Sequence, residues 1–185
     1  VLGCNSFFDS FKADADDINL YSARKEHLIR PLTDSFTEHT GIKVNIITAK
    51  AAQLHQRIMR EGDNSKADVL LSLDAGNLWK VQKYGMFQSI TSSKINAVVP
   101  NNLRGPNDEW VGIAKRSRVI YYNPSNVSND EIQGLSYEDL SDPRWKGRVV
   151  IRKSNNIYNQ SLVASLVKNN GKKATCEWSK GIVAN

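Results

Sequence analysis

The feature that most constrains this fold is a regular alternation of strand-like and helix-like segments in the first half of the chain. The strand patterns and the helical patterns that follow them lie, in order, at 18–22, 26–41, 42–48, 51–62, 67–74 and 75–85. Short connections between such segments predict a parallel sheet with helices on both faces. Ligands of such sheets bind at the carboxyl ends of the strands, so the loops after the first and third strands are candidate binding loops.

The first helical segment carries its apolar residues at helical spacing. Leu28, Ile29, Leu32 and Phe36 share one predicted helix face. Pro31 lies inside this pattern, where it predicts either the start of the helix or a kink.

The rhythm of the sequence changes after residue 85. Turn residues and little periodicity mark 87–110, and the segments 110–124 and 148–153 have the pattern of further strands. A helix carrying Tyr158 is predicted next, and Gly171 opens the pattern of one more helix.

These changes divide the chain into four predicted parts. We expect an N-terminal tether or signal remnant at 1–16, a first α/β lobe at 17–113, a hinge crossing strand at 114–123 and a partial second α/β lobe at 124–185. One strand and two helices are too few to bury a sheet on both faces. The sequence therefore indicates that the second lobe is incomplete in this chain.

The charge and the motifs exclude several classes of function. The net charge is +6, but the densest basic groups, at 115–118 and 144–153, run into apolar strand-like segments. The sequence has no zinc finger, RNA-recognition motif or basic zipper, so we expect no nucleic-acid partner. A surface for acidic partners or an anionic ligand fits the charge as well.

Common catalytic motifs and membrane spans are missing from the sequence. It contains no G-x-S-x-G, H-E-x-x-H, P-loop or Gly-rich dinucleotide turn, and its three histidines, His27, His39 and His55, are scattered. No apolar run approaches the roughly 18 residues that span a bilayer. We expect a protein that is not an enzyme.

The chain begins with "VLGC", a small residue before a cysteine and after two apolar residues. This pattern resembles the lipobox, where a signal peptide is cut before a cysteine that then receives lipid. Cys4 is therefore a candidate lipidation site, and the alternative is a boundary of the sequence record.

Tyr158 lies where a helix is predicted to begin. Ser154, Asn155 and Asn156 are typical cap residues, and an apolar helical run follows at 161–167. The residues alone leave two interpretations of the tyrosine, a ring packed at the helix start or a phenol that binds a ligand.

Five segments of the chain form a recognisable set. They are, in order, "LYSARKEHLIRPLTDSFTEHTGIKV", "ADVLLSLDAGNLWKVQKYGMFQSI", "KRSRVIYYNP", "DLSDPRWKGRVVIRKSNNIYNQSLVASLV" and "WSKGIVAN". Together they resemble the ferric-iron-binding solute-binding proteins of bacterial ABC importers, over residues 18–185. The resemblance implies a two-lobed α/β fold of the periplasmic-binding-protein type, class II-like, in which each lobe is a mostly parallel sheet with helices on both faces.

The resemblance also implies a function and partners. Proteins of this kind capture Fe(III), with or without a synergistic anion, and deliver it to an ABC permease in the inner membrane. We therefore expect an extracytoplasmic, monomeric iron-transport protein in the periplasm, or on the outer face of a membrane through a lipid anchor. The alternative is the same fold binding another small solute, an oxyanion or a polyamine. The basic residues Arg24, Arg116, Arg118 and Arg152 suit an anion better than a polyamine.

The resemblance places Tyr158 on an iron-binding phenolate position. Fe(III) is a hard cation that prefers anionic oxygen, and a bound cation can deprotonate its ligand. The helix start beside the tyrosine implies an anion site at Ser154 and Asn155, with Arg24 of the first lobe as a further candidate.

The first lobe departs from the family pattern. A histidine or a histidine–tyrosine pair often follows the first strand in the family, whereas this chain has Lys25, Glu26 and then His27. Glu26 and His27 are candidate metal ligands, and the alternative is that both are solvated residues at a helix start. Asp74 is predicted to cap the following helix rather than to bind metal.

The adjacent tyrosine pair that supplies further phenolates in the family lies beyond the part of the fold represented here. Tyr121 and Tyr122 are also adjacent, but alternating strand geometry points such neighbours to opposite faces. We interpret them as packing residues of the hinge.

Overall fold

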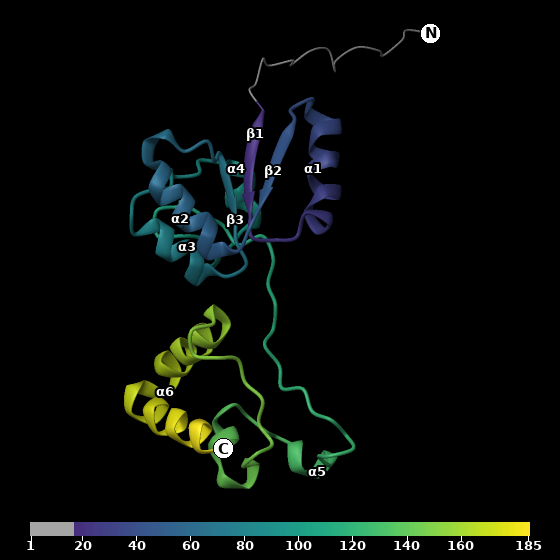
Figure 1. Cartoon of the computed structure of the whole chain (residues 1–185), viewed down its shortest axis with the longest axis vertical. Helices are drawn as coiled ribbons and strands as arrows, with labels where there is room; N and C mark the ends of the chain where they lie inside the picture. The colour runs from purple at the N-terminus through teal and green to yellow at the C-terminus, as the bar shows by residue number, and fades with distance from the viewer. Residues whose placement is uncertain (1–16) are drawn as a thin grey trace. The chain divides into compact units, whose positions relative to one another are not determined.

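The computed structural model describes residues 17–185 (Figure 1). Residues 1–16, and with them Cys4, lie outside the described residues, so the tether and the lipidation site stay predictions. The chain forms two compact units that divide between Val111 and Gly112. The predicted crossing between lobes at 114–123 also stays a prediction.

The first unit is built on a three-stranded parallel sheet of order β2-β1-β3. Its strands and helices are β1 (Ile18–Ser22), α1 (Glu26–Thr40), β2 (Val44–Thr48), α2 (Ala51–Glu61), β3 (Val69–Leu71), α3 (Ala75–Gln82) and α4 (Ser93–Val98). In Figure 1, α1 lies on one side of the sheet and α2 and α3 lie on the other. The alternation predicted from the sequence is confirmed here, element by element.

The core of the first unit lies between the sheet and α2. Tyr21, Leu54 and Ile58 are buried in one cluster there. On α1, Ile29 is buried with Thr33, whereas Leu28 is 53% exposed and Leu32 66% exposed. The predicted apolar face of this helix is therefore only partly covered. The helix starts at Glu26 and includes Pro31, so the proline does not mark its start.

The carboxyl edge of the sheet is where three helices begin. The helices α1, α2 and α3 each start within a few residues of the ends of β1, β2 and β3. Asp74 caps α3, since its Oδ1 accepts a hydrogen bond of 2.8 Å from the Gly76 backbone N–H. The predicted capping role of Asp74 is confirmed.

The second unit is helical. Its elements are α5 (Asn129–Ile132), the 3₁₀ turns η3 (Glu138–Ser141) and η4 (Pro143–Trp145), and α6 (Ile157–Ala184). The long α6 breaks at Gly171, which has φ 82° and ψ 162°, a conformation that favours glycine. The two helices predicted around residue 171 are thus confirmed as two halves of α6.

The two halves of α6 share a small core with η3. Leu162 and Leu166 from the first half are buried against Trp178 from the second half. The indole N–H of Trp178 donates to the Tyr137 carbonyl at 2.7 Å, which satisfies the polar atom of a buried ring. This core packs the two halves of α6 against each other.

The strands predicted in the second unit are wrong for this chain. Residues 112–185, all of which are described, contain no β-strand, and 114–123 and 148–153 run without regular secondary structure. A strand is stable when its backbone groups pair with a neighbouring strand, and neither segment has such a partner within this unit. The expected parallel sheet of the second lobe is therefore not formed by these residues.

Gly181 of α6 lies close to Ser141 of η3. A Cβ added at Gly181 would lie 2.6 Å from both the Cβ and the carbonyl oxygen of Ser141. Overpacking of this kind costs about 1–3 kcal/mol. We predict that Gly181→Ala lowers the free energy of unfolding by about that amount in a urea titration, whereas Ala164→Ser, on the exposed side of α6, leaves it nearly unchanged. Equal stability of both variants would contradict this packing.

His55 on α2 is half-buried, and its Nε2 atom is buried without a hydrogen-bond partner among the described residues. Burial lowers the pKa of His55 from its usual 6.5, and the charge of Lys80 lowers it further. The folded first unit therefore favours the neutral imidazole more than the unfolded chain does, in which the pKa is near 6.5.

The stability of the first unit is predicted to decrease on mild acidification because of His55. A lowered folded pKa means that its contribution is complete above pH 6.5 and is lost as the pH falls toward the folded value. Urea unfolding between about pH 7.5 and 5.5 should show this decline in the wild type and a weaker decline in His55→Gln. His39→Gln, at an exposed position of α1, should keep the wild-type decline. Identical slopes for all three proteins would rule out this role of His55.

Candidate functional site

The first turn of α6 places Tyr158. Asn156 is the N-cap residue, and its Oδ1 accepts a hydrogen bond of 3.0 Å from the Tyr158 backbone N–H. An N-cap side chain of this type satisfies one of the free N–H groups at a helix start. Tyr158 therefore lies in the first turn, as the sequence predicts, and its side chain is half-buried.

Two arginines from a distant segment reach this tyrosine. Arg116 donates a hydrogen bond from Nη2 to the Tyr158 phenol oxygen at 2.8 Å. Arg118 donates from Nη2 to the Tyr158 carbonyl oxygen at 2.7 Å. Side chains two residues apart in an extended segment point to the same side, which explains why both reach the same residue.

A third arginine approaches the same ring. The guanidinium carbon of Arg152 lies 5.2 Å from the centre of the Tyr158 ring, and that of Arg116 lies 5.1 Å from it. Both distances are within the range of cation–π attraction. Tyr158 is thus held by hydrogen bonds and by stacking, and the three guanidinium groups give its surroundings a positive charge.

The site offers one anionic oxygen ligand for a hard cation. A phenol oxygen has two acceptor positions, so the hydrogen bond from Arg116 leaves one for a metal ion. Among residues 17–185, no group of three or more His, Cys, Asp and Glu side chains could hold a metal. Tyr158 is therefore not part of such a cluster among these residues.

The predicted anion residues Ser154 and Asn155 lie in the turn directly before α6 and are exposed. The carbonyl oxygen of Ser154 accepts a hydrogen bond of 3.3 Å from Gln160 Nε2. This contact closes the turn onto the helix. The anion-binding role of Ser154 and Asn155 stays a prediction.

The candidates of the first lobe lie at the start of α1, in the first unit. Glu26 forms an ion pair with Arg30 one turn along the helix, and His27 is exposed. The Arg24 backbone N–H donates to Ser22 Oγ at 3.0 Å, which shapes the loop after β1. The metal-binding roles of Glu26 and His27 and the anion-binding role of Arg24 stay predictions.

Three other tyrosines of the second unit differ from Tyr158. The side chain of Tyr121 is 91% exposed among the described residues, and its packing role at the hinge stays a prediction. The Tyr122 hydroxyl donates to Asn129 Oδ1 at 2.9 Å. Burial raises the pKa of the Tyr137 phenol, although Arg118 opposes the rise. Because a raised pKa disfavours the phenolate, Tyr137 is poorly suited to bind a metal.

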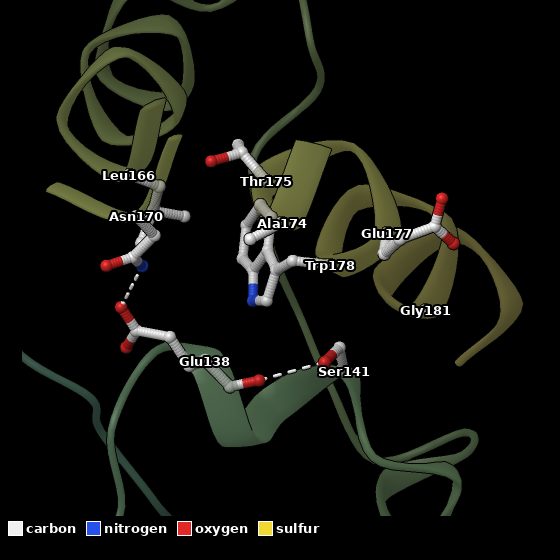
Figure 2. A pocket seen from close by; sticks show the side chains of 9 residues that line it. All are labelled: Glu138, Ser141, Leu166, Asn170, Ala174, Thr175, Glu177, Trp178 and Gly181. Atoms are coloured by element: carbon white, nitrogen blue, oxygen red, sulfur yellow. Dashed lines mark hydrogen bonds between the residues drawn. The ribbon is translucent and has the colours of Figure 1, made fainter. Parts of the chain in front are cut away.

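A hollow of about 410 Å³ lies between η3 and α6, and Figure 2 shows the side chains that line it. Its two carboxylates already have partners, because Asn170 donates to Glu138 at 2.6 Å and Lys180 donates to Glu177 at 2.8 Å. Its walls include Leu166 and Trp178 from the core of this unit. We assign it no ligand, and it contains none of the predicted site residues.

The sequence predicted a binding role for Tyr158 but did not predict that arginines surround it. Arg116, Arg118 and Arg152 were recognised only as basic residues that suit an anion. The signal that was available is the "RSR" pattern, which in an extended segment puts two guanidinium groups on one side. The target of those groups lies about forty residues along the chain and is visible only in the fold.

Solved structures define the class of protein to which this fold belongs. The chain is similar to the ferric binding protein from Campylobacter jejuni, with a TM-score of 0.84 and 37% identity over 91% of this chain and 53% of that chain. It is also similar to the Trichodesmium protein IdiA (FutA) in complex with iron and citrate ligands, with a TM-score of 0.83 and 49% identity over 91% of this chain and 53% of that chain. The chain therefore forms part of the fold of the two-lobed periplasmic binding proteins, and the predicted fold class is confirmed to that extent.

The sequence comparisons identify the family. The model of the bacterial extracellular solute-binding proteins matches residues 64–185, and the chain belongs to this family. Among curated relatives, Iron uptake protein A1 of Synechocystis is 49% identical over 172 residues, which are 93% of this chain and 47% of that protein. The chain spans about half the length of the curated relatives it matches.

None of the helices in residues 17–185 is both long and apolar enough to cross a membrane.

The cap of α6 is predicted to control the order of the site. Asn156→Ala removes the side-chain oxygen that binds the Tyr158 N–H and should lower the free energy of unfolding by about 1 kcal/mol. It should also speed hydrogen exchange at the Tyr158 amide. Asn156→Asp keeps an acceptor oxygen and serves as the matched control. Unchanged exchange and stability in Asn156→Ala would contradict the capping role.

Proposed function

We propose that this chain is part of an extracytoplasmic substrate-binding protein that captures ferric iron and delivers it to an ABC permease. The observation that carries the proposal is the setting of Tyr158, a half-buried phenol in the first turn of α6 whose oxygen accepts a hydrogen bond from Arg116 at 2.8 Å. Fe(III) prefers anionic oxygen, and a phenolate supplies it when the cation displaces the phenol proton.

The names of the relatives support iron as the cargo. The matched proteins include an iron uptake protein of Synechocystis, an Fe(3+)-binding periplasmic protein of Serratia marcescens and a ferric binding protein of Campylobacter jejuni. The Trichodesmium structure holds iron together with citrate. In this chain Fe(III) is therefore the proposed substrate, with or without a synergistic anion near Ser154 and Asn155.

Further ligands complete the proposed site in the whole protein. Glu26 and His27 are the candidates from the first lobe, where Lys25 and Glu26 stand at the positions at which the family often has histidine and tyrosine. Lysine is a poor ligand for Fe(III), whereas the Glu26 carboxylate is a hard donor. Glu26 would have to exchange its ion pair with Arg30 for the metal.

The proposal also covers location and partners. We expect binding and transport rather than catalysis, a periplasmic location or a lipid anchor at Cys4, and a monomeric protein that meets its permease in the inner membrane. The match to bacterial extracellular solute-binding proteins supports this location.

A small oxyanion is the second candidate cargo. The observation that favours it is the group of arginines around one ring, because guanidinium groups bind carboxylate-like and phosphate-like anions well. Colour separates the two candidates. An iron–phenolate complex absorbs visible light, whereas an oxyanion complex is colourless.

Tyr158→Phe tests the proposal in the full product of the gene. Phenylalanine keeps the ring, so the loss of packing should be far below the roughly 3–5 kcal/mol of an aromatic-to-alanine change. Loss of a charged ligand should weaken Fe(III) binding more than tenfold, and each factor of ten corresponds to about 1.4 kcal/mol. The phenolate absorption band should also shift or weaken.

Tyr121→Phe is the matched control for this substitution. It makes the same chemical change at a tyrosine that is 91% exposed in the same unit, and it should leave iron affinity and colour unchanged. Equal iron affinity in the wild type and Tyr158→Phe would show that Tyr158 packs at the helix start and binds no metal.

A further inference from the structure

Arg116 makes two kinds of contact with one side chain. Its Nη2 donates to the Tyr158 oxygen at 2.8 Å, and its guanidinium carbon lies 5.1 Å from the centre of the Tyr158 ring. The planar guanidinium group of an arginine can stack near a tyrosine ring and also donate to the oxygen of that tyrosine. The pair thus fixes both the position of the ring and the direction of its oxygen.

The hydrogen bond decides which side of the phenol oxygen stays open. One acceptor position of the oxygen is occupied by Arg116, so an incoming cation has the other. A ligand held in place before the metal arrives loses less conformational entropy on binding.

Arg116 itself is unsuited to bind a metal. A guanidinium group has no acceptor atom and stays protonated in proteins. Any effect of Arg116 on a bound cation must therefore pass through another group, and the Tyr158 oxygen is a group that it contacts.

We propose that Arg116 is a positioning residue that orients the Tyr158 phenolate for the metal and sets the affinity of the site through it. This inference rests on the proposed function, because it needs a metal at Tyr158. With this role, Arg116 becomes part of the site without contacting the metal. It lies in the extended segment that precedes the helices of the second unit.

A double-mutant cycle on the full product of the gene tests the inference. The proteins are the wild type, Arg116→Gln, Tyr158→Phe and the variant with both changes, and the probe is Fe(III) supplied with citrate. Arg144→Gln is the control, since it removes the same charge from an arginine of the same unit that stacks on Trp145 instead. Iron affinity and the visible absorption band are measured for each protein.

If Arg116 acts on the metal through Tyr158, its substitution should matter only when the Tyr158 phenol is present. Arg116→Gln should weaken iron binding about tenfold, in line with a hydrogen bond to a charged group, and should shift the absorption band. In the Tyr158→Phe background the same change should have almost no further effect. Arg144→Gln should leave affinity and band position unchanged.

Three results would overturn the positioning role. An equal loss of affinity in both backgrounds would mean that Arg116 acts on the cargo or its anion independently of Tyr158. An unchanged affinity and band in Arg116→Gln, with a clear loss in Tyr158→Phe, would remove Arg116 from the site while leaving the proposed function intact. No change in Tyr158→Phe would contradict the proposed function and the positioning role together.

Discussion

The hydrogen bond from Arg116 to the Tyr158 oxygen is the interaction on which the candidate site depends. It joins an extended segment without regular secondary structure to the first turn of α6, and Arg118 adds a second bond at the Tyr158 carbonyl. The side chain of Asn156 caps the same turn, because it accepts a hydrogen bond from the Tyr158 backbone N–H. The phenol is therefore held at its backbone and at its oxygen, as a preorganised ligand must be.

The arginines around Tyr158 also limit what the site can bind. Guanidinium charges near a ring repel a bare cation, so Fe(III) binds here only with enough anionic ligands to offset both the metal and the arginines. The single negative charge of one phenolate is too small to offset these positive charges. The chain spans about half the length of its curated relatives, and additional phenolates, a carboxylate such as Glu26 or a synergistic anion would complete the charge balance in the whole protein.

Much of the fold could be predicted from the sequence because its signals are local. Hydrophobic periodicity and helix-ending glycines are read from neighbouring residues, and they located β1 through α3, the cap at Asp74 and the break of α6 at Gly171. The strands expected at 114–123 and 148–153 depend on a partner strand that local sequence does not describe. The arginine contacts of Tyr158 span 40 and 42 residues of chain, so only the folded structure brings them together.

The central claim is that the Tyr158 oxygen is bonded to ferric iron while Arg116 holds that oxygen from its other side. Anomalous X-ray diffraction at the iron absorption edge, on crystals of the iron-loaded full product of the gene, tests both parts at once. The account predicts an iron peak within bonding distance of the Tyr158 oxygen, with the Arg116 guanidinium still in hydrogen-bond contact with the same atom. An iron peak bonded to other residues, with the Tyr158 oxygen bonded to protein or water alone, would contradict it.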